Sequence, residues 1–146
     1  MPSIEPFIHL LGINTSILTT PEKILLEAEL FERVCNKLKE IFRKQYHEYF
    51  SLINFSKKKE DLMLDQHFVR FIINDILESE EYSIKGIAYY TNTFQDVLEE
   101  LATGCNTNPS AFLFRKLIFL HQSVRRSLYD YIIKKIITEY TTLSNK

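Results

Sequence analysis

Apolar residues recur at helical spacing along most of the chain. The first stripe follows Thr20-Pro21-Glu22, in which Thr caps a helix, Pro suits its first position and Glu favours its positive end. The stripe consists of Ile24, Ala28, Phe31, Cys35, Leu38, Phe42, Tyr46, Tyr49 and Ile53. Its steps of three and four predict one long amphipathic helix, packed either in a bundle or against a second copy of the chain.

Two further stripes predict two more helices. One runs from Glu60 to Ser79, after the segment Ser56-Lys57-Lys58-Lys59, which we interpret as a solvated loop or helix tip. Its inward residues are Leu64, Phe68, Phe71, Ile72 and Ile76. The other runs from Ala111 to Tyr140 and is expected to pack on the N-terminal helix. Its inward residues are Leu113, Leu117, Leu120, Val124, Leu128 and Ile132, and its outward residues are Arg115, Lys116, Gln122, Arg125, Arg126 and Tyr129.

The segment from residue 83 to residue 110 predicts two short helices joined by a tight turn. Ser83 is a suitable N-cap for the first helix, Ile84 to Tyr90, with Ile84, Ile87 and Ala88 inward. Asn92 suits a left-handed turn residue. The second helix runs from Phe94 to Thr103 with Leu98 and Leu101 inward, Gly104 ends it, and Pro109-Ser110 opens the next helix.

The spacing of small, turn and apolar residues in this segment matches a known motif. Asn92, Leu98 and Leu101 follow Ala88 by four, ten and thirteen positions, and Gly104 comes three residues later. In this respect residues 83–121 resemble the lambda-repressor-like (Xre/Cro-type) helix-turn-helix family. The resemblance implies a helix-turn-helix core, to which this chain adds long N-terminal and C-terminal helices.

The resemblance also implies a function, that of a DNA-binding transcription regulator. In that family the second helix enters the major groove of double-stranded DNA, and a homodimer places two such helices about 34 Å apart. The corresponding DNA-binding residues here are Lys85, Thr91, Asn92, Thr93, Gln95, Asp96 and Glu99, with Arg115 and Lys116 able to hold phosphates.

The charge of the second short helix suggests an alternative function. Asp96, Glu99 and Glu100 face outward on it, and DNA phosphates repel carboxylates. The alternative is a non-enzymatic protein interaction module, in which a degenerate helix-turn-helix binds a protein partner through this acidic face. The sign of the surface around Gln95 to Glu100 distinguishes the two functions.

Composition supports an all-α chain. The 146 residues include only three Gly and four Pro, too few for the turns of a many-stranded sandwich. We expect residues 1–55 to form a lead-in and the long helix, residues 60–146 to form the helix-turn-helix core and C-terminal helix, and both parts to make one composite domain.

The net charge differs between the two parts of the sequence. It is −4 from Met1 to Tyr82 and +3 from Ser83 to Lys146. A polyanionic partner would therefore bind to the second part.

Patterns typical of catalysis or of metal binding are not found in the sequence. The four His lie far apart and none has a partner four residues away, so neither a metal site nor a cofactor is predicted. Cys35 lies on the first stripe and Cys105 in a loop, with no nucleophile motif around either. The chain is therefore not expected to be an enzyme.

The sequence also bears on the cellular compartment. Two cysteines in unlike contexts favour a reducing environment. No apolar run is long enough to span a membrane, and Glu5, His9 and Asn14 interrupt the N-terminal stretch that a secretion signal would need. We expect a cytoplasmic protein without a membrane partner.

Overall fold

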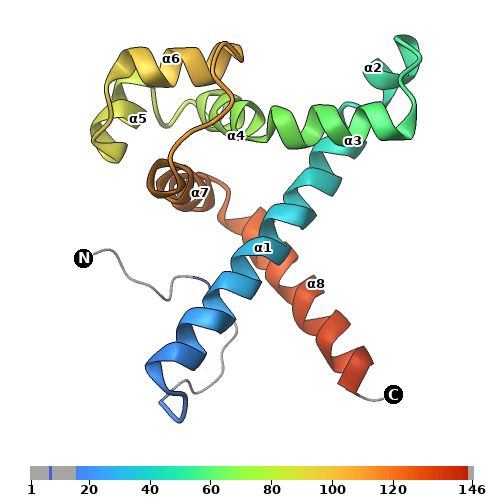
Figure 1. Cartoon of the computed structure of the whole chain (residues 1–146), viewed down its shortest axis with the longest axis vertical. Coiled ribbons are helices and arrows are strands. Elements are labelled where there is room, and N and C mark those ends of the chain that lie inside the picture. Colours follow the sequence, from blue (N-terminus) through green and yellow to red (C-terminus); the bar gives the residue numbers. More distant parts are fainter. Residues whose placement is uncertain (1–6, 8–15, 145–146) are drawn as a thin grey trace. The chain divides into compact units, whose positions relative to one another are not determined.

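The computed structural model describes residue 7 and residues 16–144 of the chain. Within these residues the chain forms eight helices and no strand, which confirms the all-α prediction (Figure 1). Most of the lead-in expected over residues 1–20 lies outside the described residues. The helices are α1 (Thr20–Gln45), α2 (His47–Leu52), α3 (Lys57–Gln66), α4 (Phe68–Glu78), α5 (Ile84–Thr91), α6 (Gln95–Thr103), α7 (Ala111–Val124) and α8 (Arg126–Ser144).

The chain divides into two compact units, one of which is built from both ends of the sequence. Unit 1 contains the residues up to Leu38 and those from Arg126 onward, and unit 2 contains Lys39 to Arg125. No described helix combines the length and apolarity that a membrane span requires.

Unit 1 packs α8 against the first part of α1 around the buried ring of Phe7. This ring stacks on Tyr129, with centroids 6.3 Å apart, and lies 6.0 Å from the ring of Phe31. The Phe7 backbone N–H donates to Oε1 of Glu27 at 3.3 Å, and Lys37 donates to Glu139 across the two helices. The expected packing of the C-terminal helix on the N-terminal helix is thus observed.

The inward face of α1 differs from the predicted stripe in its first turns. Ile24 and Ala28 are exposed, whereas Glu27, Leu30 and Val34 are buried. Glu27 faces inward because its carboxylate accepts a hydrogen bond from the Phe7 N–H. The buried face of these first turns therefore includes a charged residue, and a search for apolar residues alone does not find it. The helix begins at Thr20 and is capped by Thr19, whose hydroxyl accepts the Glu22 N–H at 3.3 Å, one residue before the predicted cap.

Each of the three long predicted helices is interrupted once. The breaks fall at Tyr46, His67 and Arg125, with φ of −104°, −108° and −127°. None of these residues is Gly or Pro, so no helix-breaking residue marks the breaks in the sequence. The break at Arg125 also resets the inward face of α8: Tyr129, predicted to face outward, is completely buried.

The core of unit 2 is centred on α4. This helix packs against α6 and α7, and α5 packs against both α6 and α7 (Figure 1). The buried apolar residues of these helices include Val69, Ile72, Ile73, Ile76, Ile87, Leu98, Leu101, Leu113, Leu117, Ile118 and Leu120. At the other end of unit 2, the ring of Phe42 from the last turns of α1 lies against the rings of Phe68 and Phe71.

The two short helices form where the sequence predicts them. The Ser83 hydroxyl accepts the Gly86 N–H at 3.1 Å and caps α5. Asn92 is left-handed with φ of 52°, and Gly104, with φ of 83°, ends α6. Leu98 and Leu101 point inward as expected. The predicted bend at Asn92 is therefore confirmed, and α5 and α6 pack against each other on either side of it.

Candidate interaction surface

The outer face of α6 carries three carboxylates. Asp96, Glu99 and Glu100 are all exposed because Leu98 and Leu101 hold the opposite face of the helix in the core. We call these three residues the acidic face. In the described part of the chain none of the three makes an ion pair, and α6 contains no Lys or Arg. Gln95 donates to Glu99 at 2.9 Å. Within these residues the acidic face thus presents to solvent three carboxylates that form no ion pair.

Two aromatic side chains flank the turn that leads into the acidic face. Tyr89 is 90% exposed and Phe94 is 85% exposed. The turn between them is tight, since the Thr93 N–H donates to the Ala88 carbonyl at 3.0 Å. Tyr89 faces outward because Ile87 and Ala88 take the inner face of α5. Exposed aromatic residues beside charged ones are typical of protein interaction surfaces rather than of inert surface.

Among the residues predicted to bind DNA, those of the turn differ widely in accessibility. Thr91 is only 3% exposed, and its hydroxyl donates to the Ile87 carbonyl at 2.8 Å. The Thr93 hydroxyl donates to the Thr91 carbonyl at 3.2 Å. Lys85 and Asn92 are exposed. At the turn, solvent therefore reaches the side chains of Lys85 and Asn92 but not that of Thr91.

The two predicted phosphate-binding cations of α7 lie against aromatic rings. The Lys116 ammonium sits 4.3 Å from the centroid of Phe112 and donates to the Thr91 carbonyl at 3.2 Å, at the negative end of α5. The Arg115 guanidinium lies 5.1 Å from the centroid of Phe119. The structure thus brings Lys116 to the turn, where it satisfies a helix carbonyl.

The left-handed residue of the turn gives a direct test of the bend. An Asn92→Val variant is expected to lose about 1–2 kcal/mol in free energy of unfolding, because a β-branched side chain disfavours positive φ. Asn92→Gly should be close to neutral. Urea denaturation measures both. Asn36→Val, at an exposed helical position of α1, is the matched control and should cost only a few tenths of a kcal/mol. Equal losses in both Val variants would contradict the left-handed turn.

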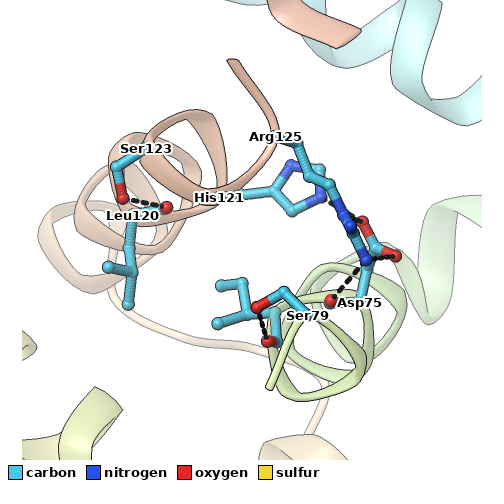
Figure 2. Close-up of polar contacts among 7 residues, drawn as sticks. Asp75, Ser79, Leu120, His121, Ser123 and Arg125 are labelled. Atoms are coloured by element: carbon cyan, nitrogen blue, oxygen red, sulfur yellow. Dashed lines mark hydrogen bonds and ion pairs between the residues drawn. The ribbon is translucent and has the colours of Figure 1, made fainter. Parts of the chain in front are cut away.

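A polar cluster ties α4 to α7 in the interior of unit 2 (Figure 2). Nε2 of His121, which is completely buried, lies 2.6 Å from Oδ2 of Asp75. Arg125 contributes Nε at 3.1 Å from Oδ2 and Nη2 at 3.2 Å from Oδ1, and Nη2 also donates to the Asp75 carbonyl at 3.3 Å. An ionised carboxylate only accepts hydrogen bonds, so Nε2 of His121 carries the hydrogen in this pair.

These contacts shift the ionisation of the cluster. The hydrogen bond from His121 holds the pKa of Asp75 below its usual value, and Arg125 adds to this effect although burial opposes it. The hydrogen bond to Asp75 in turn raises the pKa of Arg125. The nearby hydroxyls of Ser79 and Ser123 donate to carbonyls of their own helices, Ile76 and Leu120 (Figure 2). The cluster therefore joins α4 to α7.

Comparisons with protein families, with curated proteins and with solved structures find no match for this chain. In the described residues, no three or more His, Cys, Asp or Glu side chains gather where they could hold a metal ion. Cys35 is buried and Cys105 is exposed, and neither forms a disulfide within the described residues.

Tyr89, Phe94 and the Asp75 cluster are not among the site residues that the sequence predicts. Helical periodicity predicts that Tyr89 faces outward, because it places this residue opposite the inward residues Ile84 and Ile87. Phe94 gives no such signal, since it precedes α6 with an extended backbone, ψ of 137°. Asp75 and His121 are 46 residues apart, so no local pattern joins them.

Proposed function

We propose that this protein is a protein interaction module whose α5–α6 surface binds a basic segment of a partner protein. One observation carries the proposal: the acidic face is exposed, forms no ion pair within the described residues and follows a turn flanked by the exposed rings of Tyr89 and Phe94. Lys and Arg side chains pair with carboxylates, and their ammonium or guanidinium groups also bind to aromatic faces. A basic segment would use both kinds of contact.

The test is binding of a fluorescent arginine-rich peptide, measured by anisotropy at low and at physiological salt. Glu99→Lys/Glu100→Lys is expected to weaken binding by about tenfold or more, because two attractive contacts become repulsive. Tyr89→Ala/Phe94→Ala should also weaken binding, but with less change in its salt dependence.

The matched control is Glu32→Lys/Asp130→Lys, which makes the same change in net charge at exposed helical positions of unit 1. This variant should bind the peptide almost as the wild-type protein does. Equal weakening by both double variants would show that only the overall charge attracts the peptide, and the proposal would then be wrong.

A second function, DNA binding by a repressor-like helix-turn-helix, is favoured by a different observation. The bend at Asn92 leaves the outer face of α6 exposed, as a recognition helix requires. Retention of the wild-type protein on random duplex DNA separates the two functions. If α6 reads DNA, the wild-type protein should be retained at low salt, and retention should fall steeply as salt is added. Absence of retention by the wild-type protein would favour the interaction module.

A further inference from the structure

A second charged surface lies at the end of unit 2 formed by α2 and α3. Lys57, Lys58 and Lys59 form the exposed first turn of α3. Leu52, which ends the preceding helix α2, is 84% exposed, and Leu62, one turn along α3 from Lys58 and Lys59, is 59% exposed. We call these five residues the lysine tip.

The positive charge of the lysine tip is not neutralised by the acids of its own helix. Glu60 and Asp61 both pair with Arg43, Glu60 at 3.2 Å from its guanidinium. Asp65 pairs with Lys39 at 3.0 Å. No ion pair to Lys57, Lys58 or Lys59 forms within the described chain. Cations from α1 thus occupy the α3 carboxylates and leave the three lysines with net positive charge.

Local helix stability does not explain these lysines. The N-terminal end of a helix is positive, so cations in the first turn are unfavourable there. The Ser56 hydroxyl accepts the Lys59 N–H at 3.2 Å and already caps the helix. Lysines in this position, together with exposed leucines, therefore point to a contact outside the helix.

We propose that the lysine tip of one copy of this chain docks on the acidic face of a second copy. The inference rests on the proposed function and names its partner. The two surfaces are complementary in charge, and both offer apolar contacts, Leu52 and Leu62 on one side and Tyr89 and Phe94 on the other.

The two surfaces lie at opposite ends of unit 2, so they meet between copies rather than within one. Helix α3, which is about 15 Å long, lies between the lysine tip and α4, the helix on which α6 packs (Figure 1). Contact between two different surfaces is heterologous, so each copy keeps one free surface of each kind and association continues head to tail. Its strength falls as salt screens the charges.

Two charge-reversal variants of the full chain test this inference. Glu99→Lys/Glu100→Lys makes both surfaces basic, and Lys58→Glu/Lys59→Glu makes both surfaces acidic. The second change places acids at a helix N-terminus, where they favour folding. Circular dichroism of each variant verifies that its helix content is kept. The average mass in solution is then measured by sedimentation equilibrium over a range of protein and salt concentrations.

The expected result is that the mass of the wild-type protein rises with concentration and returns to the monomer value at high salt. Each variant alone should stay monomeric, and an equimolar mixture should reach at least about twice the monomer mass, because every contact in it joins opposite charges. The inference is overturned if the wild-type protein is monomeric throughout, if either variant alone associates as the wild-type protein does, or if the mixture stays monomeric.

Peptide binding and lipid binding distinguish the remaining outcomes. If the wild-type protein binds the arginine-rich peptide but never self-associates, the proposed function holds and the second copy is the wrong partner. If neither occurs, both are wrong. If Lys58→Glu/Lys59→Glu abolishes sedimentation with phosphatidylserine vesicles and leaves the mass of the protein unchanged, the lysine tip binds anionic lipid and this inference is wrong.

Discussion

Asp75→Asn is expected to lower the free energy of unfolding by about 2–3 kcal/mol. Asparagine keeps the size of the side chain but removes its charge, so the Arg125 guanidinium loses a two-point partner and the buried His121 ring loses a charged acceptor. Urea denaturation of both proteins at neutral pH measures the loss. Asp130→Asn, at an exposed position of α8, is the control and should change stability by less than about 0.5 kcal/mol.

The pH dependence of this loss tests its electrostatic origin. Because the folded pKa of Asp75 is lowered, its contribution is fully present above the unfolded pKa and is lost as the pH falls through the folded pKa. The stability difference between wild type and Asp75→Asn should therefore narrow in acid. A difference that stays constant from neutral to acid pH would show that shape rather than charge causes the loss.

Leu98→Ala is expected to cost about 3 kcal/mol, within the range for leucine truncation in a closed core. Leu98 is completely buried on the inner face of α6, which packs against α4 and α5. Loss of the Leu98 side chain should also weaken binding of the arginine-rich peptide, because this side chain holds α6, and with it the acidic face, in place. Thermal denaturation and anisotropy measure the two effects.

Leu62→Ala provides the comparison for Leu98→Ala in the same unit. Leu62 is mostly exposed, so its truncation should change stability by less than about 0.5 kcal/mol. Similar losses for the two leucines would contradict the packing described for α6.

The parts of the fold that sequence predicts well are those specified by neighbouring residues. Ser83, Asn92 and Gly104 each act through their own backbone or a residue nearby, and the structure places all three as expected. The acidic face could be predicted for the same reason, because Leu98 and Leu101 fix which side of α6 faces the core.

Other features depend on residues far apart in the chain and escape prediction. The break between α7 and α8 occurs at Arg125, whose side chain bonds to Asp75, 50 residues earlier. Glu27 is buried because Phe7 donates to it, and the burial of Tyr129 depends on the same phenylalanine. Hydrophobic periodicity contains no information about such partners.

The charge of the lysine tip could likewise not be read from composition. The sequence places Glu60 and Asp61 directly after Lys57, Lys58 and Lys59, which suggests local neutralisation. The structure instead pairs both acids with Arg43. Tertiary structure, rather than the order of residues, therefore decides which charges remain available.

The discontinuous construction of unit 1 has a consequence for biosynthesis. During translation, all residues of unit 2 are made before α8, so unit 2 can begin to fold while the ribosome is still adding the C-terminal segment. Unit 1 must wait, since Tyr129 and Glu139 contribute to it from a helix that is synthesised after unit 2. Until then the residues of α1 up to Leu38 that are buried in the folded protein stay exposed on the nascent chain, where they can form non-native contacts.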